Sequence, residues 1–163
     1  MGIRLIADSC CDTGPQTDER LRDLSKAPLQ VLVEEQAFVD DGTSHLEELI
    51  AAMKASRQAA RSACPGPEDF ACRIRGADDC LVITLSSKLS GSYNAARNAR
   101  DLVLEDEPGK RIHILDSASA SAGETRLALF AQACLDAGMN SHVGKPLDMK
   151  VLIGEILKYT DAR

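Results

Sequence analysis

Short apolar runs alternate along this chain with stretches of helical periodicity. The apolar runs predict strands at Ile3–Ala7, Leu29–Val33, Gln36–Val39, Leu81–Leu85 and Ile112–Leu115. Helices are expected over about residues 17–24, 44–56, 90–104, 122–137 and 148–159, with a short one from Pro67. Because strands and helices alternate, we expect an α/β fold of three layers, in which a mostly parallel sheet carries helices on both faces.

Composition narrows the class of protein. The chain has 163 residues, of which 44% are hydrophobic, and this suits a single globular domain spanning residues 1–163. Its net charge of −6 argues against a nucleic-acid partner, which would require clustered Lys and Arg. No apolar run is long enough to span a membrane and no signal-peptide pattern is visible, so we expect a cytoplasmic location.

The six cysteines give no metal-binding or disulfide pattern. They are widely scattered apart from the adjacent pair Cys10 and Cys11, and no Cys-x-x-Cys pair occurs. The three histidines lie in unrelated segments. Structural zinc sites usually show ligands paired at short spacing. We therefore expect reduced thiols, no metal and no cofactor.

The turn after the strand Leu81–Leu85 is the strongest candidate for a ligand site. Ser90, Gly91 and Ser92 place hydroxyls and backbone N–H groups at the start of a predicted helix. The macrodipole of a helix favours an anion at its N-terminus, so a carboxylate or a phosphate is the first ligand to consider. The alternative is an ordinary helix cap, in which a serine caps the helix and the glycine eases the turn.

Polar residues also follow two other predicted strands. Asp8 and Ser9 follow the first strand, and Asp116 and Ser117 follow the last. The carboxyl ends of parallel strands lie at one edge of the sheet, so these residues are expected to rim the same crevice. The alternative is local turn chemistry, since Asp and Ser bond readily to nearby backbone groups.

Four segments resemble the DegV family of bacterial fatty-acid-binding proteins, which serve as the acyl carrier subunit of fatty acid kinase. They are Ile83-Thr-Leu-Ser-Ser-Lys-Leu-Ser-Gly-Ser-Tyr-Asn-Ala95, Ile3–Asp12, Asp40–Gly42 and Arg111–Glu124, and the resemblance covers about residues 1–135. It implies a DegV-type fold and a non-enzymatic role in binding a long-chain fatty acid or another small carboxylate. It also implies that Ser90 and Ser62 contact the carboxylate. Ala63 and Cys64 replace polar residues of the family pattern.

The end of the chain departs from the family pattern. A complete family member carries a second, lipid-holding domain, which we expect to be absent here. Residues 136–163 instead resemble the C-terminal strand and helix of a response-regulator receiver domain, with the dipeptide Lys145-Pro146. Receiver activity is not expected, because the central strand Leu81–Leu85 ends without an aspartate.

Three hypotheses of function follow. The first is a fatty-acid-binding module that works with a fatty acid kinase subunit. The second is a truncated or chimeric α/β scaffold with no physiological ligand. The third, an enzyme acting on a small phosphorylated or acyl substrate, is the weakest, because we find no nucleophile–base pair, metal cluster or phosphate-binding loop.

Overall fold

The structure is a computed structural model that describes residues 2–21, 23–43, 46–139 and 149–160. The chain divides into two units, residues 1–132 and residues 133–163, and each is described by itself.

A four-stranded parallel sheet forms the centre of the first unit. Its order is β2-β1-β6-β7, with β1 at Ile3–Asp8, β2 at Ser25–Ala27, β6 at Asp79–Thr84 and β7 at Ile112–Asp116. All three pairings are parallel. The mixed α/β class and the parallel sheet predicted from the sequence are confirmed. The polar residues that follow β1, β6 and β7 consequently lie at one edge.

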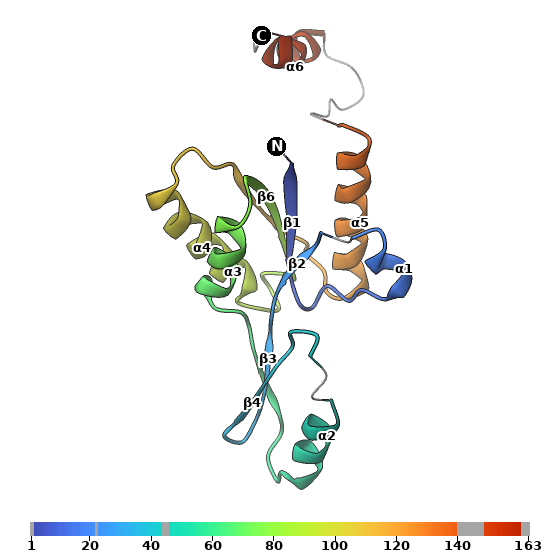
Figure 1. The fold of residues 1–163 in the computed structure, drawn as a ribbon, viewed down its shortest axis with the longest axis vertical. Coiled ribbons are helices and arrows are strands. Elements are labelled where there is room, and N and C mark those ends of the chain that lie inside the picture. Colours follow the sequence, from blue (N-terminus) through green and yellow to red (C-terminus); the bar gives the residue numbers. More distant parts are fainter. Residues whose placement is uncertain (1, 22, 44–45, 140–148, 161–163) are drawn as a thin grey trace. The chain divides into compact units, whose positions relative to one another are not determined.

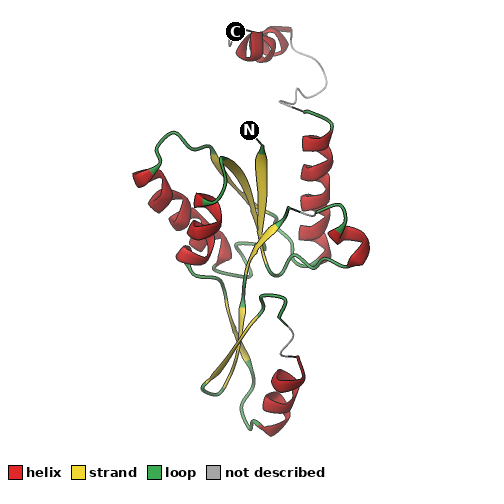
Figure 2. Ribbon diagram, in the orientation of Figure 1, coloured by secondary structure: helices red, strands yellow, loops and turns green. Residues whose placement is uncertain are grey.

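Helices cover both faces of this sheet (Figures 1 and 2). On one face lie α3 (Pro67–Arg75) and α4 (Ser92–Asp106). On the other lie α1 (Pro15–Asp18) and the beginning of α5 (Ala122–Asp136). The core between the sheet and the first pair of helices is aliphatic apart from one ring, and it includes the fully buried side chains Phe70, Ile74, Val82 and Val103.

A second, antiparallel sheet is formed by the part of the chain between β2 and β6 of the parallel sheet. Its order is β4-β3-β5, with β3 at Gln30–Val33, β4 at Gln36–Val39 and β5 at Arg61–Ala63. The predicted hairpin between β3 and β4 is confirmed, and Glu34 adopts a left-handed φ of 53° at its turn. The helix α2 (Leu46–Ala55) connects this hairpin to β5.

Some boundaries differ from those expected. The helix predicted over residues 17–24 is only the four-residue α1, and β2 and β5 were not predicted at all. Ser62 therefore lies in a strand rather than in a loop. The helix expected from Ser90 begins at Ser92, with Gly91 as its N-cap.

The second unit contains the helix α6 (Met149–Thr160), which matches the predicted final helix. The predicted receiver-like strand and Lys145-Pro146 lie outside the described residues. None of the described helices is long and apolar enough to cross a membrane.

Candidate functional site

Asp8 organises the carboxyl edge of the parallel sheet. Its side chain is fully buried, and its two carboxylate oxygens accept the backbone N–H groups of Leu85 and Cys10, at 2.9 and 3.1 Å. The Ser92 hydroxyl is a third hydrogen-bond partner. Burial raises the pKa of this carboxyl above its ordinary value, and the three hydrogen bonds offset part of that rise. One carboxylate thus joins the ends of β1 and β6 to the start of α4.

The serines predicted to hold an anion are in contact with each other. The Ser90 and Ser92 hydroxyl oxygens lie 3.1 Å apart, and the Ser92 backbone N–H donates to the Ser90 hydroxyl at 3.2 Å. Ser92 is fully buried and its hydroxyl hydrogen-bonds Asp8, whereas Ser90 is half-buried and Gly91 is exposed. An external anion at this turn would therefore meet Ser90 and Gly91 first.

Gly91 also brings this turn against the end of β5. A Cβ atom at Gly91 would lie 2.9 Å from the Cys64 sulfur, closer than real Cβ contacts allow. The glycine thus permits the start of α4 to approach the segment that begins with Ser62. The turn at Ser90 and the segment that contains Ser62 are therefore neighbours.

A pocket of about 450 Å³ lies between the end of β1, the β3–β4 hairpin and α2. We call it the hairpin pocket. Ser9 and Ser62 contribute hydroxyls to its wall, and the Ser9 hydroxyl accepts the Leu29 backbone N–H at 2.9 Å. Most of the exposed wall is apolar, through Leu29, Val31, Phe38, Val39, Leu46 and Leu49, and four more polar residues also line it: Asp12, Gln30, Asp40 and Thr43. An elongated apolar molecule with a polar head suits such a wall.

Asp116 and Ser117 do not line the hairpin pocket. Asp116 accepts the backbone N–H groups of Ser87 and Ala118, at 3.2 and 2.9 Å. The Ser117 hydroxyl donates to the Ser119 carbonyl at 3.1 Å. The bond from Ser87 ties the loop after β6 to the loop after β7, and the other two bonds are local to the loop after β7, as in the turn chemistry given above as the alternative.

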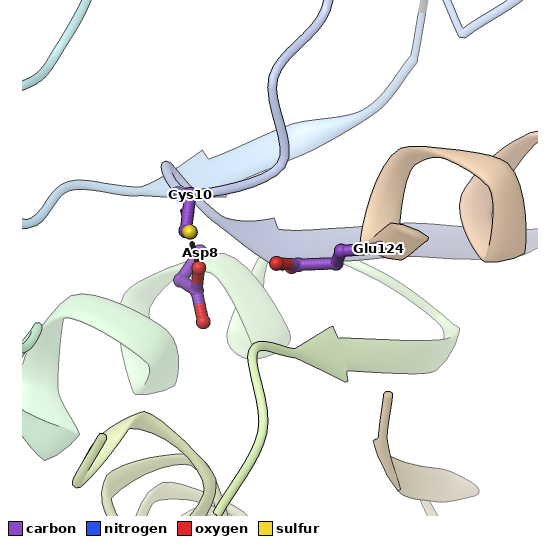
Figure 3. A group of neighbouring side chains, drawn as sticks. All are labelled: Asp8, Cys10 and Glu124. Atoms are coloured by element: carbon purple, nitrogen blue, oxygen red, sulfur yellow. Dashed lines mark hydrogen bonds between the residues drawn. The ribbon is translucent and has the colours of Figure 1, made fainter. Parts of the chain in front are cut away.

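Glu124, which was not predicted as a site residue, lies near Asp8. A Cβ atom at Gly123 would overlap the Ser119 side chain, so the glycine lets the first turn of α5 lie against the loop after β7. Glu124 then extends from α5 toward Asp8 and Cys10 (Figure 3). One carboxylate oxygen of each acid and the Cys10 sulfur lie within 4.8 Å of one another. We call these three residues the carboxylate–thiol cluster.

The environment of Glu124 opposes its ionisation. The side chain is fully buried, and neither carboxylate oxygen has a hydrogen-bond partner among the described residues. Burial raises the pKa of Glu124 to about 9, and the nearby charge of Asp8 adds to the rise. Burial also raises the pKa of the Cys10 thiol. A glutamate in the first turn of a helix is usually exposed, where it interacts with the helix dipole. The position of Glu124 in the sequence therefore does not predict its burial.

The comparisons with known proteins agree with this architecture. A family model described as an uncharacterised protein of the DegV family matches residues 2–142. This chain belongs to the DegV family. A DegV domain-containing protein of Streptococcus pneumoniae is 33% identical over 141 residues, which are 86% of this chain and 50% of that protein. A relative from Streptococcus gordonii is 32% identical over 160 residues, which are 98% of this chain and 54% of the relative.

Two solved DegV-type structures superpose on nearly the whole chain. A DegV family protein of Ruminococcus gnavus, refined with vaccenic acid, is 31% identical, with a TM-score of 0.76 over 96% of this chain and 54% of that protein. The Streptococcus pneumoniae fatty acid kinase (Fak) B3 protein, loaded with linoleic acid, is 30% identical, with a TM-score of 0.75 over 99% of this chain and 55% of that protein.

This DegV chain spans about half the length of the relatives it matches. The matches to the Streptococcus gordonii relative and to the kinase B3 protein extend over nearly all of it, so they include most of residues 136–163. The receiver-like interpretation of that segment stays a prediction.

Proposed function

We propose that this chain binds the carboxylate and part of the acyl chain of a long-chain fatty acid in the hairpin pocket. The observation that carries the proposal is the pocket itself, whose mainly apolar wall bears the Ser9 and Ser62 hydroxyls. DegV proteins about 30% identical to this chain have been crystallised with vaccenic and linoleic acids, which supports the same ligand class here.

The energetics favour the acyl chain over a short carboxylate. Each buried methylene group contributes about 0.8 kcal/mol, whereas a hydrogen bond to a charged group contributes about 1.5–3 kcal/mol. A few methylene groups in the hairpin pocket therefore equal the contribution of one serine. We infer that apolar contacts supply most of the affinity, while Ser62 in the pocket wall and Ser90, which lies in the turn next to the Ser62 segment and outside the pocket lining, fix the position of the head group.

The test is a titration of lipid-stripped protein with palmitic acid. Leu46 lines the pocket and is 59% exposed, so Leu46→Asp places a charge at the wall without disturbing a core. We expect it to weaken binding at least about tenfold. Met53→Asp is the matched control, because Met53 is on the same helix, is 49% exposed and does not line the pocket.

Ser62→Ala and Ser90→Ala test the head-group contacts. Each should weaken binding by about 1–3 kcal/mol if its hydroxyl bonds the carboxylate. Ser87→Ala, in the same loop as Ser90 but bonded to Asp116, should leave binding unchanged. Failure of the wild-type chain to bind palmitic acid would favour the alternative, a scaffold with no physiological ligand.

A role as the acyl-carrying subunit of a fatty acid kinase extends this proposal. It is supported by the likeness to the Streptococcus pneumoniae kinase B3 protein. In this role the chain presents the carboxylate and the kinase supplies the phosphoryl transfer, so the chain itself has no catalytic residue. Loaded protein incubated with a fatty acid kinase subunit and ATP should yield acyl phosphate. Unchanged fatty acid, from protein shown to be loaded, would contradict the role.

A further inference from the structure

The carboxylate–thiol cluster has a feature that fatty-acid binding does not use. Glu124 is a fully buried acid whose two oxygens lack partners among the described residues, and it points at a second buried acid. An unpartnered buried carboxylate is costly, and natural proteins keep such a group where a proton or a cation compensates it.

No described cation donates a hydrogen bond to Glu124. Among the described residues, Lys26 is the one positive charge that acts on Glu124 and lowers its pKa from a distance, while the Lys26 ammonium group donates to the Thr13 hydroxyl at 2.8 Å. The other charges that act on Glu124 are those of Asp8 and Asp12, and both are negative. The cluster therefore lies in a locally negative, buried environment.

We propose that Asp8, Cys10 and Glu124 bind one divalent transition-metal ion, and that zinc is the ion whose chemistry fits these ligands best. One thiolate and two carboxylates are a mixed donor set, which zinc accepts readily, whereas magnesium and calcium require oxygen ligands and higher coordination numbers. Three protein ligands leave the fourth tetrahedral position of zinc open to water or to another ligand.

The geometry is close to what zinc needs. The three donor atoms lie within 4.8 Å of one another. Donors on a tetrahedral zinc ion lie roughly 3.5 Å apart, because its bonds are about 2.0–2.3 Å long. Binding of the ion would therefore draw the three donor atoms closer together.

The surroundings of Asp8 resemble the outer shell of a metal site. The Leu85 and Cys10 N–H groups and the Ser92 hydroxyl occupy three of the about four lone-pair sites of the Asp8 carboxylate and leave one for a metal ion. Hydrogen bonds of this kind hold a ligating carboxylate in position. Because Cys10 also lines the hairpin pocket, the ion would lie beside the pocket wall.

The test is zinc titration of the chelator-stripped, lipid-free full chain, followed by calorimetry and by thermal unfolding. Cys64 and Cys72 are exposed, and exposed thiols are common sites of adventitious zinc binding, so every protein carries Cys64→Ser and Cys72→Ser. We expect one equivalent to bind and to raise the midpoint of unfolding. Glu124→Gln and Cys10→Ser should each weaken binding by more than about 100-fold, since even outer-shell changes cost 10–100-fold.

Two matched control variants and a second measurement distinguish a loss of metal binding from a folding defect. Cys11→Ser changes the adjacent thiol, which contacts Thr125 instead, and Asp116→Asn changes an acid that bonds the Ser87 and Ala118 N–H groups; both should bind zinc as the parent does. Cobalt should give a sulfur-to-metal charge-transfer band that Cys10→Ser abolishes and Cys11→Ser retains.

Absence of one-to-one binding, or equal binding by Glu124→Gln and the parent, would overturn the proposal and favour a proton shared between Asp8 and Glu124. Because fatty acid is absent from this titration, its outcome does not depend on the proposed lipid-binding function.

Discussion

The backbone N–H of Leu85 donates to the Asp8 carboxylate across 2.9 Å, which links the ends of two strands 77 residues apart in the sequence. Asp8→Ala leaves this N–H group and that of Cys10 without their acceptor. We expect the free energy of unfolding, measured in urea with chelator present, to fall by about 1–3 kcal/mol. Asp8→Asn should cost less, because its amide oxygen keeps one bond. An unchanged Asp8→Ala midpoint would show that Asp8 does not support the edge of the sheet.

The core between the parallel sheet and α3 depends on Phe70. This ring is fully buried, and Phe70→Ala should lower the free energy of unfolding by about 3–5 kcal/mol through lost burial and a residual cavity. Leu102→Ala is the control on α4, since Leu102 is 43% exposed and its truncation should cost far less. Similar urea midpoints for the two variants would contradict the packing described.

Gly91 and Cys64 should be energetically coupled. Gly91→Ala places a methyl group 2.9 Å from the Cys64 sulfur, which must then rotate away. The cost should be about 0.5–1.5 kcal/mol, typical of a side chain forced off its rotamer. In a Cys64→Ala background, Gly91→Ala should no longer incur the cost of rotating the Cys64 side chain. A double-mutant cycle measures the difference, and strict additivity would argue against the contact.

The six thiols should differ in reactivity toward an alkylating agent. The thiolate is the reactive form, and burial raises the pKa of Cys11 and Cys80 to about 11. Cys64 and Cys72 are exposed. Mass spectrometry of peptides alkylated at mildly alkaline pH should show Cys64 and Cys72 modified first, with Cys11 and Cys80 modified only on unfolding. Early modification of Cys80 would show that the core opens locally.

Asp116 should make one contribution to stability that depends on pH. Hydrogen bonds from the Ser87 side chain and the Ala118 N–H lower the pKa of this carboxyl below its ordinary value of 3.8. Its stabilising effect is therefore fully present above about pH 4 and is lost as the pH falls through the lowered pKa. The difference between the unfolding midpoints of the wild type and Asp116→Asn should be constant near neutrality and shrink in acid.

Ser87→Ala provides the check on that assignment. It removes the hydroxyl but keeps the backbone N–H, so the pKa of Asp116 should move back toward its ordinary value. A carboxyl resonance of Asp116 that titrates identically in both proteins would contradict the assignment.

The sequence predicted the elements whose apolar pattern extends over four or more residues. The runs at β1, β6 and β7 are apolar enough to be recognised as strands, and the hairpin was visible because two such runs flank Glu34-Glu35. The strands β2 and β5 escaped because three residues carry too little pattern, and Arg61-Ser62-Ala63 is mostly polar. Their pairing is decided by neighbours distant in sequence.

The candidate site was predictable in part for the same reason. Ser9 and Ser62 could be named from their motifs, and both line the hairpin pocket. Glu124 could not be predicted as a site residue, because its burial depends on the close approach of α5 at Gly123 to the loop after β7. No local sequence pattern encodes that approach. Metal ligands at short spacing are visible in a sequence, whereas Asp8 and Glu124 are far apart in the chain and are brought together only by folding.

The helix α2 buries none of its residues, although Leu46, Ile50 and Met53 give it apolar side chains. A helix of ten residues is too short to persist in water on its own propensity. We expect its order to depend on the occupancy of the pocket that Leu46 and Leu49 line. In the empty protein its amide hydrogens should exchange rapidly with solvent, and a bound acyl chain should slow them. Ligand binding would then carry the entropic cost of completing the fold, so the measured affinity would understate the strength of the contacts made.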